Sequence, residues 1–226
     1  MKIYLMRHGE TEYNRVGRLQ GQSDIPLDEF GIELAKKTAE GLKGVNFDAV
    51  FSSPLQRALE TARIVAGSRK VEVETDERLK EIHFGAGEGA RFDEAKRDES
   101  HPVHNFFCKP ECYFPTGEAE SFDRVRERGR SFLEDKIFPL ESRLTADGTA
   151  VHGTAVHGRE DGNVLIVAHG AFNRCILNRI AGIPDREFWK INLPNCAVSI
   201  LSLKGGELRI LEESRVYYGT PVNGRP

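Results

Sequence analysis

Residues 1–11 read MKIYLMRHGET, and the interpretation of the whole chain starts from this stretch. Its apolar run, IYLM, is short and stops at a polar turn that contains Gly9, a pattern typical of a buried strand. In an α/β sheet, ligands bind in the crevice beyond the carboxyl ends of the strands. We therefore expect Arg7 and His8 to lie where a strand runs out into a pocket.

The side chains of this turn suit the chemistry of an anion. An imidazole is a usable nucleophile at neutral pH, because about half or more of it is unprotonated there. The guanidinium of Arg7 is a fixed cation whose fork of donors matches phosphate oxygens. Gly9 would let the backbone approach a ligand closely. A lone histidine such as His8 is more often structural, so the rest of the chain must supply the other parts of a site.

Length and composition are those of an ordinary globular protein. The chain has 226 residues, of which 39% are hydrophobic and 30% charged, enough for one large core. Its net charge of −3 gives no basic field for nucleic acid, and no apolar run is long enough to cross a membrane. The chain has four cysteines, Cys108, Cys112, Cys175 and Cys196. Without a secretion signal these cysteines are expected to be free thiols in the cytoplasm. The sequence leaves a homodimer as one possible oligomeric state.

Strand and helix patterns alternate along the chain. Helix patterns follow Pro26 and Pro54, with Pro54 expected in the first helical turn, and a longer helix from Ser121 should kink or end at Pro139. The expected strands are 48–51, 71–74 and 163–168, followed by a hairpin over 196–212. This order predicts an α/β three-layer sandwich, with a mostly parallel central sheet, helices on both faces and an inserted cap.

Three further groups of residues could complete a site for an anion. The long polar loop after residue 11 offers Asn14, Gln20 and the backbone of Gly21 as hydrogen-bond donors, although a solvated surface loop is an equal alternative. Arg57 falls in the first turn of a helix, near free N–H groups that favour an anion. The alternative for Arg57 is an exposed side chain paired with Glu60.

A second strand-end histidine follows the strongest buried-strand signal in the chain. The run NVLIVA ends at His169 and Gly170, which repeats the His8–Gly9 pair and precedes a helix pattern over 171–181. In that position His169 could donate a hydrogen bond to a phosphoryl oxygen. A satisfied structural histidine is the alternative, but the first motif makes the functional interpretation the better one.

Four segments occur in the order RHG (7–9), SSPLQRA (52–58), KEIHFG (80–85) and VAHG (167–170). Together they resemble the histidine phosphatase superfamily, the phosphoglycerate mutase-like proteins. The resemblance implies that His8 is transiently phosphorylated and that Arg7, Arg57 and His169 stabilise the phosphoryl group. It also assigns proton donation to Glu81, which nothing in the spacing alone singles out. Phosphate-pocket roles fall on Asn14, Gln20, Gly21 and Gly170.

The resemblance covers nearly all of the chain and implies a single domain, 1–226. A cap is expected at about 86–118 and a flexible insertion at about 144–162, where GTAVH occurs twice in tandem. Aromatic residues crowd the cap, and we favour packing for them over a wall for an aromatic leaving group. They are Phe106, Phe107, Tyr113 and Phe114.

The cap also contains side chains that could bind zinc, namely His101, His104, Cys108 and Cys112. Their composition suits the metal, but the short Cys-x2-Cys hairpin is absent and Pro102 and Pro110 interrupt any helical register. We therefore predict no metal ion and no cofactor.

Three functions compete on this sequence. The favoured one is hydrolysis of small phosphomonoesters, with phosphate or sulfate as simple ligands of the pocket. The alternative is phosphoryl transfer of the phosphoglycerate mutase type, which would need extra cations in the cap. The cap offers Arg91, Lys96, Arg97 and Lys109, but no adjacent arginine pair of the kind found in the cofactor-dependent mutases. The third function is an inactive phosphate-binding module.

Overall fold

The structure is a computed structural model that describes residues 1–146 and 162–219. The insertion predicted at about 144–162 therefore lies almost entirely outside the described residues, as do both copies of the GTAVH repeat.

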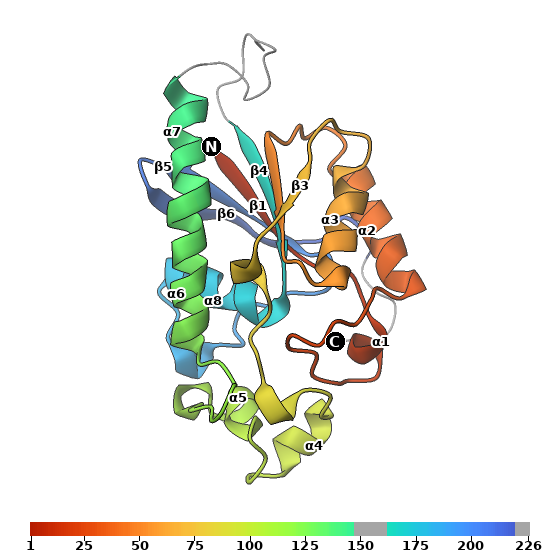
Figure 1. Cartoon of the computed structure of the whole chain (residues 1–226), viewed down its shortest axis with the longest axis vertical. Coiled ribbons are helices and arrows are strands. Elements are labelled where there is room, and N and C mark those ends of the chain that lie inside the picture. The colour runs from red at the N-terminus through yellow and green to blue at the C-terminus, as the bar shows by residue number, and fades with distance from the viewer. Residues whose placement is uncertain (147–161, 220–226) are drawn as a thin grey trace.

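A six-stranded sheet with the order β3-β2-β4-β1-β5-β6 forms the centre of the protein (Figure 1). β1 pairs in parallel with β4, β4 with β2, and β2 with β3, whereas β5 and β6 form the antiparallel C-terminal hairpin. The mostly parallel α/β sheet predicted from the sequence is thus confirmed. The strands are β1 Lys2–Arg7, β2 Ala49–Ser52, β3 Val73–Thr75, β4 Asn163–Ala168, β5 Val198–Lys204 and β6 Glu207–Arg215.

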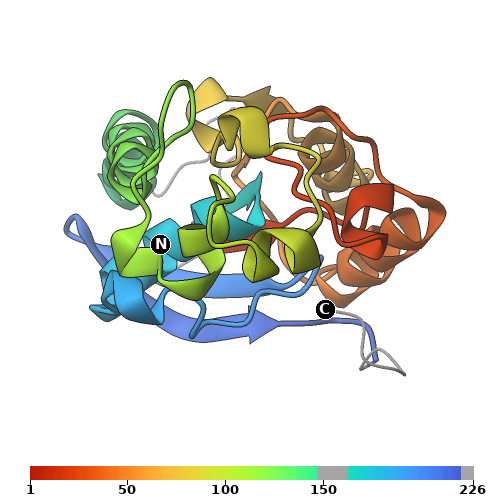
Figure 2. The ribbon, with the colours of Figure 1, turned by 90° about the horizontal axis from the view of Figure 1, so that it is seen from below.

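Helices cover both faces of the sheet, as predicted. α2 (Glu29–Gly41) and α3 (Gln56–Ala66) lie on one side, and α6 (Phe122–Phe132) and α8 (Gly170–Ala181) on the other (Figure 2). Alternate side chains of a strand point to opposite faces, so β1 contributes to two cores. Its odd-numbered apolar residues pack with α6 and α8, and its even-numbered ones pack with α2 and α3.

The prediction for Pro54 is wrong, and of the two outcomes predicted at Pro139 the helix end does not occur. Pro54 precedes α3, which begins at Gln56 after Leu55 as its N-cap. The long helix continues past Pro139, because a π-helical segment, Leu133–Ile137, joins α6 to α7 (Phe138–Ala146). A proline has no N–H and its ring clashes with the carbonyl of the preceding turn, and a wider turn at that point accommodates both defects.

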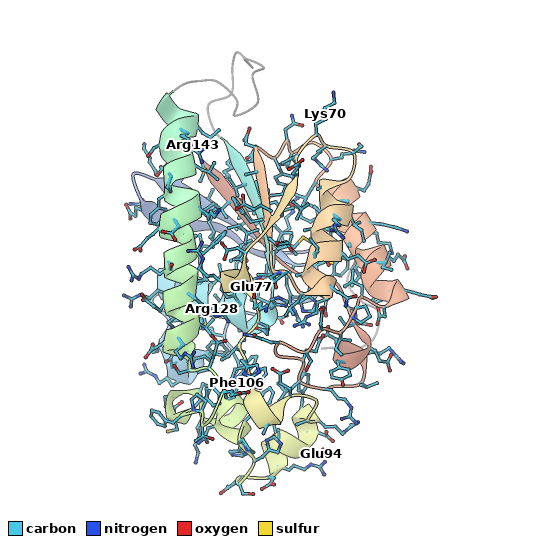
Figure 3. All side chains as sticks on the ribbon, viewed as in Figure 1. Lys70, Glu77, Glu94, Phe106, Arg128 and Arg143 are labelled. Carbon is cyan, nitrogen blue, oxygen red and sulfur yellow. The ribbon has the colours of Figure 1, made fainter. Side chains whose placement is uncertain are left out.

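The cap residues form short helices at the carboxyl end of the parallel strands (Figure 1). They include α4 (Phe92–Arg97) and α5 (His104–Cys108), followed by the 3-10 turn Pro110–Cys112. Figure 3 shows Phe106 where the cap meets the rest of the protein. Among the residues that the structure describes, no helix is both long enough and apolar enough to cross a membrane.

Candidate active site

The two strand-end histidines meet at the centre of the protein. β1 and β4 are neighbours, with Arg7 paired opposite Ala168, so the turns that follow them begin at the same level. The ring centroids of His8 and His169 lie 5.1 Å apart, with 57° between the ring planes. Both side chains are buried. The sheet register therefore brings together two residues that are far apart in the sequence.

Hydrogen bonds fix the orientation of the His8 ring. Its Nδ1 lies 2.6 Å from the carbonyl oxygen of Gly9. Because a carbonyl can only accept, Nδ1 carries the proton and Nε2 keeps its lone pair. The Nδ2 of Asn195 donates to the carbonyls of His8 and Gly9, at 3.1 and 3.0 Å, and the hydroxyl of Tyr218 donates to the carbonyl of Asn195. The turn thus presents Nε2 as the free nitrogen.

Gly9 is needed for packing in this structure. A Cβ at that position would lie 2.6 Å from the carbonyl oxygen of Gly31 in α2. The Gly9 N–H also donates to Thr61 Oγ1 in α3, at 3.0 Å. The sequence suggested close approach of a ligand, whereas the contact that the structure records is with a helix. The turn that carries His8 is therefore anchored to both helices of one face.

Arg7 and Arg57 place two guanidinium groups beside the histidines. Arg57 is fully buried, which excludes the exposed pairing with Glu60. Its Nη1 and Nη2 donate to the carbonyls of Ser23 and Gly21, at 2.7 and 2.6 Å. The Nη1 of Arg7 donates to a backbone carbonyl at 2.6 Å. A guanidinium has five N–H donors, so each arginine keeps several, and among the described residues neither Nε has a partner.

The loop after α1 (Glu12–Arg15) packs against these cations. The hydroxyl of Thr11 lies 3.1 Å from Asn14 Oδ1 and 2.9 Å from Gln20 Oε1, which fixes both amides. Gly21 has φ +52°, and a Cβ there would lie 2.1 Å from an oxygen of Glu88. The carboxylate of Glu88 accepts hydrogen bonds from the backbone N–H groups of Gln22 and Ser23. A partly buried acid, Glu88, therefore holds the loop on Arg57.

Glu81 lies at the N-terminus of α8. One carboxylate oxygen accepts the backbone N–H of Ala171 at 3.0 Å, and the other accepts those of Phe172 and Ile82 at 2.8 and 2.9 Å. Free N–H groups at a helix start favour a negative charge. These contacts fix the Glu81 carboxylate in the same cavity that His8 lines.

Burial and neighbouring cations shift the protonation equilibria of the site. Burial, and then Arg57, hold the pKa of His8 well below its ordinary value of 6.5, and the same causes act in the same order on His169. Burial also lowers the pKa of Arg57 to about 10. At neutral pH both imidazoles are therefore uncharged while the guanidinium stays protonated, which suits a nucleophile beside a clamp for an anion.

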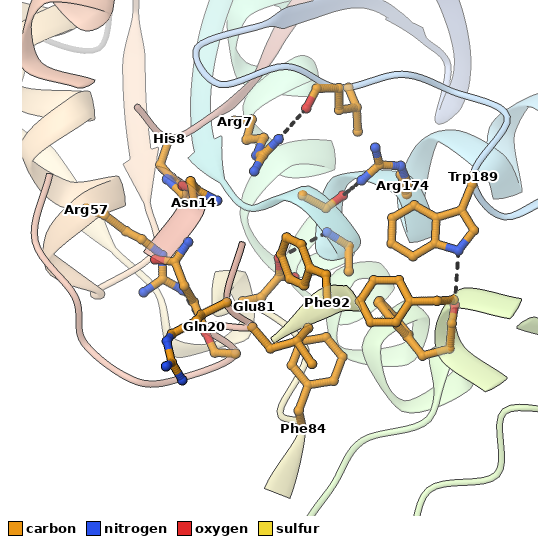
Figure 4. A pocket seen from close by; sticks show the side chains of 18 of the residues that line it. Arg7, His8, Asn14, Gln20, Arg57, Glu81, Phe84, Phe92, Arg174 and Trp189 are labelled. Atoms are coloured by element: carbon orange, nitrogen blue, oxygen red, sulfur yellow. Dashed lines mark hydrogen bonds between the residues drawn. The ribbon is translucent and has the colours of Figure 1, made fainter. Parts of the chain in front are cut away.

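These groups line a cavity of about 540 Å³ (Figure 4). Eight of the nine residues predicted for the site lie on its surface: Arg7, His8, Asn14, Gln20, Gly21, Arg57, Glu81 and Gly170. The ninth, His169, is fully buried behind them and contacts the His8 ring. Neither ring nitrogen of His169 has a hydrogen-bond partner among the described residues. We call this end of the cavity the floor.

The opposite end of the cavity contains residues that the sequence did not single out. Trp189 and Arg174 face it, together with Phe92 of α4 (Figure 4). Lys96 of α4, which the sequence offered only as a cap cation, also lines the cavity. Two signals in the sequence could have pointed to these residues. Trp189 is the single tryptophan of the chain, and Arg174 interrupts an apolar helix pattern. We call this end the wall.

The aromatic cluster of the cap divides between the two roles considered for it. Phe106 and Phe107 lie on the cavity wall, and Phe106 is also part of the core. Tyr113 is buried in the core, as packing requires. Phe114 is 81% exposed, so it belongs to neither.

The candidate metal ligands of the cap have other contacts. His104 Nδ1 lies 3.1 Å from a backbone carbonyl, and His101 Nδ1 accepts a backbone N–H. Cys108 and Cys112 are exposed, and all four cysteines of the chain are free, as predicted. In the part of the chain that the structure describes, no group of three or more His, Cys, Asp or Glu side chains could hold a metal ion.

The sequence profile of the histidine phosphatase superfamily (branch 1) matches residues 3–214. The chain belongs to this superfamily. Its members are enzymes, either phosphatases or mutases, and the relatives of this chain include both kinds.

Relatives of the histidine phosphatase superfamily match this chain over most of its length. "Probable phosphoglycerate mutase GpmB" of Proteus mirabilis is 30% identical over 199 residues, 88% of this chain and 83% of that protein. The structure of YhfR from Bacillus stearothermophilus has a TM-score of 0.78 and 31% identity, covering 95% of this chain and 97% of that one. The phosphoserine phosphatase of Entamoeba histolytica, solved with 3-phosphoglyceric acid, has a TM-score of 0.75 and 29% identity, with coverages of 95% and 97%.

Proposed function

We propose that the protein hydrolyses small phosphomonoesters through a phosphohistidine intermediate on His8, with no metal ion or cofactor. The observation that carries the proposal is the convergence of His8, Arg7, Arg57 and Glu81 on one cavity, with the ring of His169 packed against His8. Inorganic phosphate or sulfate would occupy the same position as the phosphoryl group.

In the first step, Nε2 of His8 attacks the phosphorus in line with the leaving oxygen. The N–P bond forms as the P–O bond breaks, and Glu81, which must be protonated for this step, gives its proton to the departing alkoxide. Arg7 and Arg57 stabilise the charge on the equatorial oxygens, because Arg57 is buried, Arg7 is partly buried, and each guanidinium has donors left over. His169 donates a hydrogen bond from a neutral ring, for which its unpartnered nitrogens are available.

In the second step, water attacks the phosphohistidine. The carboxylate of Glu81 takes a proton from that water, inorganic phosphate leaves, and Nε2 of His8 regains its lone pair. Asn14, Gln20, Gly21 and Gly170 line the same space and would position the phosphoryl oxygens. The Nδ1–H bond to Gly9 keeps the ring in the tautomer that both steps require.

The positions of the cap cations favour hydrolysis over mutase-type transfer. Arg91 and Arg97 both pair with Asp93, at 3.0 Å, on the outer side of the cap. Among the described residues, Lys96 lines the cavity and Lys109 does not. A mutase must hold a bisphosphate, and of the four cations that the cap offers, Lys96 alone lines the cavity. Incubation with 3-phosphoglycerate separates the two activities, because a phosphatase releases free phosphate whereas a mutase forms 2-phosphoglycerate.

Replacement of the nucleophile tests the proposal directly. With nitrophenyl phosphate as substrate, we expect His8→Ala to lower kcat by about 10⁴-fold or more, since a nucleophile cannot be replaced by its neighbours. His101→Asn, a change to a cap histidine outside the cavity, is the matched control. Undiminished turnover by His8→Ala would overturn the mechanism, and a phosphate label trapped on the wild type but not on the variant would support it.

The inactive binding module is the remaining alternative. It predicts phosphate binding without turnover and without a trapped label. The full set of reactive groups on one cavity argues against it.

A further inference from the structure

A column of alternating cations and rings runs along the wall of the cavity. The rings of Phe107 and Trp189 are stacked, with centroids 5.6 Å apart and planes at 13°. The Nζ of Lys96 lies 5.3 Å from the Phe107 centroid, and the guanidinium carbon of Arg174 lies 4.8 Å from the Trp189 centroid. Each ring thus has a cation beside it, at a distance typical of cation–π contacts.

The column joins the cap to the core. Lys96 and Phe107 belong to the cap helices α4 and α5, whereas Arg174 belongs to α8, directly behind the floor. The indole N–H of Trp189 donates to the carbonyl of Phe106 at 3.0 Å, which ties the two sides together. A wall fixed from both sides has little freedom to rearrange, so its chemistry should select among ligands.

Arg174 is held in place with donors to spare. Its Nε donates to the carbonyl of Ile191 at 3.0 Å and its Nη1 to that of Gly170 at 3.3 Å. Only 9% of the residue is exposed, and it lines the cavity. In the described chain it has no ion pair, and no hydrogen bond uses its Nη2. Arg174 therefore presents a buried positive charge to whatever fills the cavity (Figure 4).

The lining has more positive charge than a phosphoryl group can balance. Five cations line the cavity, Arg7, Arg18, Arg57, Lys96 and Arg174, against the single carboxylate of Glu81. A phosphate ester contributes about two negative charges at pH 7. Two cations stay unbalanced, and the proposed mechanism gives no role to Arg18, Lys96 or Arg174. Of these three, Arg174 alone is buried. An uncompensated buried charge is costly, so an anionic group on the substrate would be favoured beside Arg174.

The size and surface of the cavity indicate the skeleton that carries this anion. At about 540 Å³ the cavity falls in the range of sites for small molecules well beyond phosphate itself. Phe84, Phe92 and Leu193 add apolar surface between the floor and the wall. Ring edges and faces of this kind favour contact with a planar apolar group.

We propose that the wall is a second recognition site, which binds a carboxylate carried on an aromatic leaving group through Arg174. This inference rests on the proposed function, because it describes the alcohol part of the phosphomonoester whose phosphoryl group sits on the floor. Its natural ligands are aryl phosphomonoesters with a second negative charge at the far end of the ring.

Matched substrates and matched variants test the site. 4-Carboxyphenyl phosphate and its neutral isostere 4-carbamoylphenyl phosphate differ chiefly in charge. We expect wild-type kcat/KM to be about 10-fold higher for the carboxylate, the effect of one charge-assisted hydrogen bond. Arg174→Met should bring the ratio close to one, and raising the ionic strength should lower it in the wild type. Arg179→Met, on the same helix but outside the cavity, should keep the wild-type ratio.

The design separates this inference from the proposed function. Equal wild-type kcat/KM for the two esters, or an unchanged ratio in Arg174→Met, overturns the carboxylate site while hydrolysis stands. If neither ester releases phosphate, hydrolysis fails. In that case the affinities of the two non-hydrolysable analogues, in which a methylene group replaces the ester oxygen of each ester, are measured by calorimetry. Equal affinities of the carboxylate and the carboxamide analogue would overturn the site. If Arg174→Met does not fold, equal wild-type kcat/KM values for the two esters still overturn the carboxylate site.

Discussion

The floor and the wall of the cavity are built in different ways. The floor is made at the ends of parallel strands, where backbone hydrogen bonds fix the turn of His8 and the carboxylate of Glu81. The wall is made of side chains that stack across two parts of the chain, the cap and the segment around Trp189. The difference indicates that one end of the cavity serves a fixed reaction, whereas the other can vary with the substrate.

After the loss of the nucleophile proposed at His8, the largest expected effect on the floor comes from Glu81, the proposed proton donor. Glu81→Gln should lower kcat by about 10²–10⁴-fold for an alkyl phosphate, which needs protonation to leave. The loss should be much smaller for nitrophenyl phosphate, whose leaving group is stable as an anion. Steady-state kinetics on both esters measure the difference. Equal losses on the two would show that Glu81 acts on something other than the leaving oxygen.

The next effect concerns the histidine behind the nucleophile. We expect His169→Asn to reduce kcat by about 10²–10³-fold, the cost of one donor to a developing anion. His101→Asn, the same substitution at a histidine of the cap, is the control. A rate near that of the wild type for His169→Asn would assign this buried ring a structural role and leave the floor with two clamps.

Acid should destabilise the floor before the wall. The unfolded chain binds protons on its histidines near pH 6.5, but the folded pKa values of His8 and His169 are held well below that. The stability that these neutral rings contribute is present above pH 6.5 and is lost as the pH falls below it. Each should remove about 1.4 kcal/mol of unfolding free energy per pH unit. Urea unfolding of the wild type and His169→Asn between pH 7.5 and 5.5 should show a shallower slope in the variant.

The smallest effect should come from trimming the wall. Phe107→Leu keeps an apolar side chain but removes the ring that stacks on Trp189. We expect KM for an aryl phosphate to rise about 3- to 10-fold, since an aromatic pair is worth roughly 1 kcal/mol, with kcat little changed. Kinetics on nitrophenyl phosphate measure this. A fall in kcat as large as that of Glu81→Gln would mean that floor and wall are not separate in function.

The same contrast explains what could be predicted from the sequence. His8 and His169 each follow a strand, and Arg57 lies in the first turn of a helix. Their positions therefore depend on local patterns and on the rule that parallel strands end at one edge. The ring of His169 against that of His8 is the expected result of this rule. The role of Glu81 came from the resemblance to the family, because its partners in α8 are about 90 residues away.

The wall and some element boundaries could not be predicted. Whether Arg174 faces the cavity depends on the rotation of α8 about its axis, which the core around the helix decides. Trp189 meets Phe107 only because the cap folds back, and Phe114 in the same aromatic run is exposed. Pro139 sits inside a continuous helix because a π-helical segment precedes it, and local sequence rules give no warning of such a segment.

The bond from Tyr218 to Asn195 has a consequence for the integrity of the enzyme. Tyr218 follows the last strand, and through Asn195 it steadies the backbone of the nucleophile turn. A protease that trims the chain back to β6 would spare every strand pair of the sheet yet loosen that turn. Such clipping during purification would yield material that looks folded by spectroscopy while its specific activity has declined.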